Sequence, residues 1–363
     1  MLKKIALLSC LIAFSKIDID ACTGISLKTE NNNNIQARTI EWSKNKINSQ
    51  IIIEPRGKEY QSPMPNRTLG KKWKGKYGFV GASVEHESLI GEGVNEKGLN
   101  AGVFFFLNYG ELAPFNEKKV KNSLNDMDLV KWMLTSFSTV EEVKEAIKKI
   151  DVVPIIIENG QPSPTGHWRV SDAKGGNIVI EIINGGELKI YDNKVGVLTN
   201  SPGFDWQLTN LNNYVNLNLN GNKPEMLGQQ KIFPMGAGSG MLGLPGDVTL
   251  PSRFVRAAFY ANNTPKMVGN EEGITQAFHI LNNFDIPIGM TYADKNEIPK
   301  EITSATQWTT AINLNEKLFY YKTMYNQDIR LIDLKKIDFG KVQSQVLTMD
   351  KSTIQPVDEI LIK

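Results

Sequence analysis

The stretch SKIDIDACTGISLK, residues 15 to 28, places one cysteine just after an apolar segment at the start of the chain. That segment has the layout of an export signal: Lys3 and Lys4, then the apolar run IALLSCLIAF, then a polar stretch that ends in the small Ala21. A run of this length is too short to span a bilayer. Residues 1–21 are therefore predicted to be a removed signal peptide, and the mature protein is expected in the periplasm or outside the cell. Because Ile19 stands where a small residue is usual, the first cut could also fall slightly upstream, with later trimming to Cys22.

The cysteine content sharpens the question of what Cys22 does. The chain has two cysteines, and Cys10 lies within the predicted signal. Exported proteins usually hold their cysteines as disulfides, so a single thiol in the mature chain needs another explanation. It is an incidental residue, a lipid attachment site or a nucleophile. Lipidation is disfavoured because Asp20 is out of place in the IDAC sequence.

Composition and charge exclude some classes of protein. The 363 residues are 41% apolar, enough for a substantial core, and no linker divides them, so one domain is expected over residues 22–363. Loss of the signal would leave 38 basic residues against 37 acidic ones. This near balance argues against a nucleic acid or an anionic membrane as the main partner, and no later segment has the apolar length of a membrane helix.

Strand patterns dominate the chain, with fewer helices grouped between them. The NNNN patch at 31–34 predicts a turn, and NGG at 184–186 predicts a hairpin. This order favours α+β layers over a parallel βαβ sheet. Strands are expected at 35–42, 49–55, 176–193, 195–200, 306–324 and 329–334, and helices at 126–137, 139–149, 252–262 and 271–283, the second opened by Ser138 with Glu141.

Cofactor and metal motifs are weak or missing. GSGMLG at 238–243 fits G-x-G-x-x-G but has no strand before it, so it is interpreted as a flexible turn. There is no G-x-S-x-G, no H-x-x-x-H and no C-x-x-C. His279 follows the apolar face of a helix and is expected to be packed. We therefore expect no cofactor and no metal.

A cysteine at a chain start carries its own base. A free α-amine has a pKa of about 7.7 to 8.0, so it can take the thiol proton directly or through water. Such a site also needs a cation near the sulfur, a group that orients the amine and donors for an oxyanion. ARTIEWS supplies Arg38 and Glu41, with Trp42 beside them. Residues three apart on a strand face opposite sides, so these two can share a pocket only if the strand ends or bulges there; otherwise they form a surface ion pair.

Several motifs together resemble one family. They are CTGI and RTIEW, then NEKGLNAG (95–102), VLTNSPGFDWQLTNLNNY (197–214) and GLPGDVTLPSRFVRAAF (243–259). They resemble the choloylglycine hydrolase family of N-terminal-nucleophile hydrolases, which contains conjugated bile acid hydrolases and penicillin V acylases. The resemblance covers the chain after the signal and implies a four-layer αββα sandwich and a homo-oligomer, a tetramer or a dimer.

The resemblance also implies roles for single residues. Cys22 would be the nucleophile, Arg38 the first active-site arginine, Asn200 the asparagine of the T-N-x-P motif and Arg253 the arginine of PSRF. The Phe105 backbone N–H would be an oxyanion donor, with a register uncertainty of one residue. Glu41 departs from the aspartate usual in the family; its longer side chain is expected to hold the amine differently but to keep the charge and bonding capacity.

The resemblance leaves the substrate open. It implies a small N-acyl amide: a glycine or taurine conjugate of a bile acid, a phenoxyacetyl penicillin or, among Gram-negative relatives, an N-acyl homoserine lactone. The export signal, Trp42 and TSATQW (303–308) look more like the Gram-negative branch. The aromatic residues Trp42, Phe104, Phe105, Phe106 and Trp308 are expected to line an apolar acyl pocket or to be plain core. A rival from another class is a non-catalytic lipoprotein that binds an amphipathic ligand.

Overall fold

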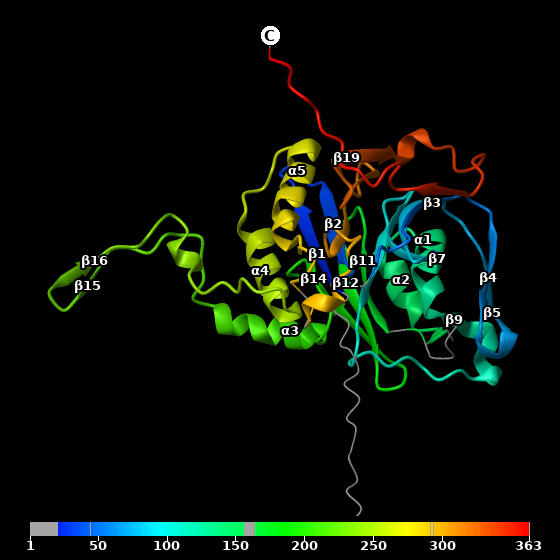
Figure 1. The fold of residues 1–363 in the computed structure, drawn as a ribbon. Helices are drawn as coiled ribbons and strands as arrows, with labels where there is room; N and C mark the ends of the chain where they lie inside the picture. Colours follow the sequence, from blue (N-terminus) through cyan, green and yellow to red (C-terminus); the bar gives the residue numbers. More distant parts are fainter. Residues whose placement is uncertain are drawn as a thin grey trace, which may run out of the picture.

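Two packed sheets form the centre of the molecule (Figure 1). The computed structural model describes residues 21–43, 45–155, 163, 165–290, 292 and 294–362. Apart from Ala21, the expected signal peptide lies outside these ranges. Within them, no helix is long and apolar enough to cross a membrane.

The first sheet has six antiparallel strands and carries the segment around Cys22. Its strands, in spatial order, are β14 (Val197–Leu198), β1 (Ala21–Lys28), β2 (Asn34–Glu41), β17 (Thr306–Asn313), β18 (Leu318–Thr323) and β19 (Asn326–Asp333). The hairpin between β1 and β2 turns through Asn32 at φ 61°, a left-handed conformation that asparagine tolerates. The turn predicted from the asparagine patch is confirmed.

The second sheet has eight antiparallel strands. Their order is β13 (Glu187–Asp192), β12 (Asn177–Ile183), β11 (Gly166–Ser171), β8 (Asn100–Phe105), β7 (His86–Asn95), β6 (Phe79–Val84), β3 (Gln50–Glu54) and β20 (Gln345–Thr348). The NGG sequence turns β12 into β13 with positive φ at Asn184, Gly185 and Gly186, as expected for a hairpin.

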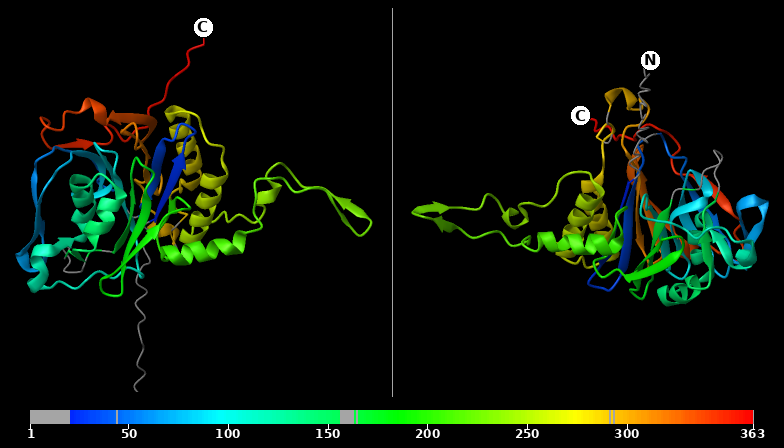
Figure 2. Two further views of the ribbon diagram at one scale, coloured as in Figure 1. Left: turned by 180° about the vertical axis from the view of Figure 1, so that it is seen from behind. Right: turned by 90° about the horizontal axis from the view of Figure 1, so that it is seen from below.

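Helices cover the outer faces of both sheets, as two views of the ribbon show (Figures 1 and 2). Helices α4 (Leu250–Asn263) and α5 (Asn270–Leu281) pack on the first sheet, and α1 (Leu129–Ser136) and α2 (Val140–Ile147) lie over the second. One apolar cluster fills the space between the sheets and under α4 and α5, and the other lies between the second sheet and α1 and α2. The four layers are therefore αββα, as the resemblance implied.

The strand β11 shows how alternation divides its side chains between the layers. Trp168 and Val170 belong to the cluster beneath α1 and α2. Successive side chains on a strand point to opposite faces, so His167 and Arg169 face the first sheet. Arg169 reaches it, since its Nη1 donates to the Ile25 carbonyl of β1 at 3.1 Å.

Some predictions of local structure need correction. The helix expected from residue 126 starts at Leu129, after a 3₁₀ turn. The capping box of α2 is formed by Thr139 and Glu142, one residue later than expected, because these side chains meet the backbone N–H groups reciprocally. The strand expected at 195–200 is only Val197–Leu198.

His279 is exposed on α5, so its expected packing is also wrong. The buried face of this helix includes Ile274, Ala277, Phe278 and Leu281, whose spacing defines the apolar stripe. His279 lies off that stripe.

Three two-stranded elements complete the fold. They are β4 (Glu59–Pro63) with β5 (Leu69–Lys74), β9 (Ser123–Asn125) with β10 (Asp151–Val153), and β15 (Glu225–Leu227) with β16 (Gln230–Ile232). The short helix α3 (Phe204–Asn210) follows β14. The β15–β16 hairpin stands away from the rest of the molecule (Figures 1 and 2). The GSGMLG sequence lies between β16 and α4. It contains a single 3₁₀ turn, Ser239–Met241, and no βαβ unit surrounds it.

Candidate active site

Cys22 lies near the start of β1, with its side chain buried between the sheets. It is 5% exposed and is a free cysteine. Its backbone N–H donates to the Asn200 Oδ1 at 2.5 Å. Asn200 follows β14, which pairs with β1, so sheet pairing brings together two residues that are distant in sequence.

Arg38 and Glu41 both converge on this point from β2. The strand ends at Glu41, and the facing strand β17 has a register shift between Thr306 and Trp308. The strand therefore ends where the sequence required it to, although only Glu41 lines the cavity beside Cys22, while Arg38 faces the second sheet. Neither side chain is a surface group, because Arg38 is 0% and Glu41 1% exposed.

Arg38 is fixed on every side by buried groups. Its Nη1 donates to the Gly91 and Val103 carbonyls at 2.8 and 2.6 Å and lies 3.6 Å from Glu92 Oε2. The guanidinium carbon lies 4.0 Å from the centre of the Phe104 ring. Among the described residues its Nη2 has no hydrogen-bond partner, so the two N–H groups of this nitrogen remain available.

Arg253 links the remaining polar groups of the site. Its Nη1 donates to Thr23 Oγ1 at 2.8 Å and to Glu41 Oε2 at 3.2 Å, and its Nη2 donates to Asn200 Oδ1 at 3.3 Å. Helix α4 positions it, and burial lowers the pKa of its guanidinium while Glu41 opposes that shift. Arg253 thus connects the Glu41 carboxyl group to the Asn200 side-chain amide, which contacts Cys22.

Burial shapes the charge states at the centre of the site. It raises the pKa of the Cys22 thiol, and the positive charge of Arg38 is the main opposing influence. Burial also raises the pKa of Glu41 to about 7, against the attraction of Arg253. The cations near Cys22 therefore offset part of the desolvation that disfavours thiolate.

The raised pKa of Glu41 predicts a pH-dependent stability. Folded chains keep this proton up to about pH 7, while unfolded chains lose it above about pH 4.5. In the full-length chain, the free energy of unfolding should fall by about 3 kcal/mol over that interval relative to Glu41→Gln. Urea unfolding of both proteins at several pH values measures the difference. Identical pH dependence in the two proteins would contradict this prediction.

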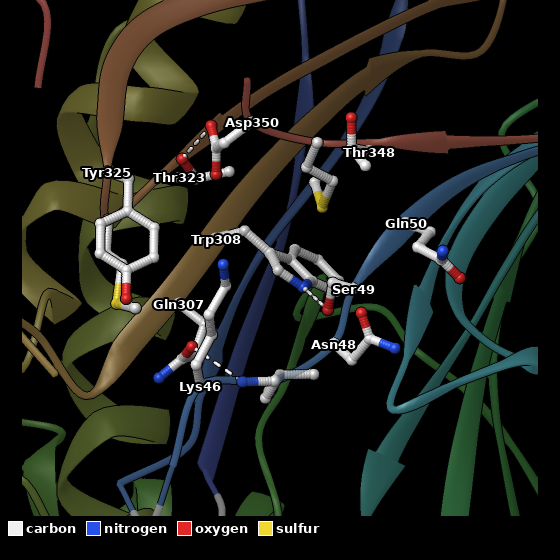
Figure 3. Close-up of a pocket in the computed structure, with 13 residues that line it drawn as sticks. Lys46, Asn48, Ser49, Gln50, Gln307, Trp308, Thr323, Tyr325, Thr348 and Asp350 are labelled. Carbon is white, nitrogen blue, oxygen red and sulfur yellow. Dashed lines mark hydrogen bonds between the residues drawn. The ribbon is translucent and has the colours of Figure 1, made fainter. Parts of the chain in front are cut away.

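A cavity of about 370 Å³ opens beside Cys22. Its lining is mostly apolar and includes Trp42, Phe104 and Phe105 from the predicted set. Phe106 does not line it and instead stacks on His167 at 4.4 Å. Trp308 does not line it either: its ring centre lies 5.6 Å from the Arg38 guanidinium carbon, and it borders a separate pocket of about 110 Å³ (Figure 3).

Several buried polar residues were not predicted from the sequence. Glu92 lies between Arg38 and Arg169, 3.3 Å from the latter's Nη2. His167 and Glu181 form a second buried pair. Asp126 lines the cavity, accepts from Ser163 Oγ at 2.6 Å and has its pKa raised to about 6 by burial. The sequence signal that could have identified Glu92, His167 and Arg169 is a charged or imidazole side chain within an otherwise apolar strand. It occurs in LIGEGVN and GHWRVS.

Metal-ligand sets are lacking in the part of the chain that the structure describes. No three His, Cys, Asp or Glu side chains there are arranged to hold an ion.

Comparison with known proteins places this geometry in context. Residues 22–349 match the sequence model of the linear amide C–N hydrolases, choloylglycine hydrolase family. A bile salt hydrolase/transferase from Clostridium perfringens is 35% identical over 321 residues, 87% of this chain and 93% of that protein. A penicillin V acylase from Pectobacterium atrosepticum is 28% identical over 324 residues, 84% of this chain and 78% of that protein.

Solved structures agree with the sequence relatives. A mutant conjugated bile acid hydrolase from Clostridium perfringens superimposes with a TM-score of 0.80 at 32% identity, covering 94% of this chain and all of that one. A penicillin V acylase from Agrobacterium tumefaciens gives a TM-score of 0.72 at 28% identity, covering 91% of this chain and 92% of that one.

Proposed function

Because this chain belongs to the choloylglycine hydrolase family and is a hydrolase of linear amides, we propose that it is an exported cysteine amidase whose nucleophile is Cys22. The observation that carries the proposal is the position of Cys22. It lies near the Arg38 and Arg253 cations and the Asn200 amide and lines a largely apolar cavity.

Removal of the residues before Cys22 would create the base that the thiol needs. The Cys22 nitrogen lies against Asn200 Oδ1, which would accept from the new α-amine, and Glu41 is close enough to act electrostatically on Cys22. As an unprotonated amine it would accept the thiol proton, and Arg38 would stabilise the thiolate that attacks the amide carbonyl. The resulting ammonium would return a proton to the leaving amine before water hydrolyses the thioester.

The backbone of β8 supports an oxyanion site next to Asn200. Phe106 N–H donates to the carbonyl oxygen of Thr165, the residue before β11, so the neighbouring pair Phe105 and Gly166 is not hydrogen-bonded. The Phe105 N–H and C=O therefore point away from β11, and its C=O accepts from Asn200 Nδ2 at 3.0 Å. The Phe105 N–H and the second Nδ2 proton are the donors that we assign to the oxyanion.

The substrate that we propose is a small N-acyl amide with a bulky apolar acyl group, either a conjugated bile salt or penicillin V. The aromatic lining of the cavity supports the apolar acyl part, and the names of the relatives supply the two classes. Purified mature protein should release free amine from glycocholate, from taurocholate or from penicillin V. An N-acyl homoserine lactone belongs in the same panel, as the alternative within the family. Release from none of these substrates would contradict the proposal.

The alternative from another class is a lipid-anchored binding protein. The intact mass of the same purified protein distinguishes it from the amidase. Acylation of Cys22 would block the α-amine and exclude the mechanism. An intact mass that shows an unmodified N-terminal cysteine supports the amidase.

We also propose that the protein forms a homo-oligomer through residues 215–249, the arm that carries β15 and β16. An isolated two-stranded hairpin is marginally stable in water, yet every residue of both strands is exposed. The arm also exposes apolar side chains that a second copy would cover: Met226, Leu227, Ile232, Phe233 and Met235.

Light scattering should give the mass of a dimer or tetramer. Replacement of Leu227 and Phe233 by serine should shift the mass toward that of a monomer. A wild-type monomer, or an unchanged oligomer in the variant, would contradict the role of the arm.

A further inference from the structure

His167 is a fully buried imidazole whose two nitrogens both face hydrogen-bond acceptors. Its Nε2 lies 2.8 Å from the Thr199 carbonyl oxygen, and its Nδ1 lies 3.0 Å from Glu181 Oε1. A backbone carbonyl can only accept, so Nε2 must carry a proton. The same Glu181 Oε1 accepts the Phe204 backbone N–H at 2.8 Å.

The count of protons follows from these contacts. A neutral imidazole has one donor nitrogen and one acceptor nitrogen, so it satisfies one of the two acceptors unless the carboxyl group carries the missing proton. Glu181 Oε1 already receives an amide proton, and acceptance of N–H bonds favours the ionised carboxylate. Both imidazole nitrogens are therefore donors.

We propose that His167 is held as an imidazolium by Glu181 and that it positions Asn200 for the reaction through the Thr199 carbonyl. This inference rests on the proposed function, because it concerns the same site. His167 is a positioning residue, since among the described contacts it does not touch Cys22. One peptide unit joins the carbonyl that it binds to Asn200, whose side chain contacts the Cys22 N–H, Arg253 and the Phe105 carbonyl.

The surrounding rings suit a cation. Phe106 stacks on the imidazole with 4.4 Å between ring centres and 6° between planes, and Phe104 meets it edge-on at 6.3 Å. The face of an aromatic ring attracts a positive charge. This contact explains why Phe106 does not line the cavity: its face is covered by His167.

The charged and titratable groups near the pair come from β13, β2, β11 and α3, the last of which contributes Asp205. Glu181 of β12 is the counter-charge, and Tyr191 of β13 has its pKa raised to about 12 by burial and by the charge of Glu181. Arg38 of β2 lies across Phe104, and Arg169 follows on β11 itself. The carboxylate of Glu181 is thus the group that directly compensates the imidazolium.

Nitrogen-15 NMR of histidine-labelled protein tests the protonation state without measuring activity. The chain has three histidines, and His86 and His279 are exposed. The His167 signals should show two protonated nitrogens at neutral pH. An unprotonated Nδ1 or Nε2 at neutral pH would overturn the proposal, whatever the enzyme's substrate proves to be.

The variant Glu181→Gln tests the positioning role. Loss of the counter-charge should leave one of the two His167 nitrogens unprotonated. It should also lower kcat by roughly 10- to 100-fold, with KM changed less than about twofold, because the misplaced amide acts on the reacting centre. His279→Gln is the matched control and should change neither quantity. A Glu181→Gln protein that keeps the imidazolium, or that loses only affinity, would contradict the proposal. The wild-type spectrum decides the protonation state even if this variant does not fold.

Discussion

Replacement of Cys22 by serine should lower kcat for amide hydrolysis by roughly 10⁴-fold or more, the scale of loss of an attacking atom in a hydrolase. A hydroxyl at this position is a much weaker nucleophile than a thiol that the Arg38 and Arg253 cations favour as thiolate. The fold should survive, because the hydrogen bond to Asn200 uses the backbone N–H, which serine retains. Release of free amine from glycocholate or penicillin V, at equal protein concentration, measures the effect.

The chain offers a matched control for this substitution. Cys10 is the other cysteine, and it lies in the segment that we expect to be removed. The enzyme matured from a Cys10→Ser precursor should have the wild-type kcat. Turnover by Cys22→Ser within tenfold of wild type would show that the nucleophile is elsewhere.

Replacement of Asn200 by alanine should lower kcat by about 10²- to 10³-fold, the usual effect of removing one oxyanion donor. The loss of kcat should be larger than for the replacement of a buried asparagine outside the site, because the Asn200 side chain contacts three groups of the site. It accepts from the Cys22 N–H and from Arg253, and it donates to the Phe105 carbonyl. The effect should fall on kcat more than on KM, since the oxyanion exists only after attack.

Steady-state kinetics with one substrate at saturating and limiting concentrations separates the two constants. Asn212→Ala is a suitable control, because this asparagine is exposed on the segment after α3. It should leave both constants unchanged. An Asn200→Ala enzyme with unchanged kcat would remove Asn200 from the reaction.

The α+β class could be predicted from the sequence because strand and turn signals are local, whereas the four-layer αββα arrangement was implied by the family resemblance. The asparagine turn after β1 and the NGG turn after β12 depend on residues that accept positive φ, and both appear as expected. The strand pattern expected over residues 306–324 also appears, as β17 and β18. Helix starts were less accurate, because Ser138 and Thr139 are adjacent capping candidates and only the three-dimensional geometry selects Thr139.

The charged interior could not be predicted in the same way. Arg38, Asn200 and Arg253 were identified by resemblance, and the structure brings them together around Cys22. The chemical roles assigned to them remain predictions. Glu92, Arg169 and His167 have partners far away in sequence, so neither spacing nor local pattern identifies them. Trp308 and Phe106 were chosen as aromatic neighbours, but facing strands and the His167 ring decide where an aromatic side chain points.

The central claim is that Cys22 becomes the first residue and forms a thioester with the substrate. Mass spectrometry of the exported enzyme, intact and after acid quench during turnover, tests it most directly. We expect a chain that begins at Cys22 with a free amine and, during turnover, an N-terminal peptide heavier by one acyl group. A chain that retains residues before Cys22 while active, a lipid on that cysteine, or an acyl group on another residue would contradict the account.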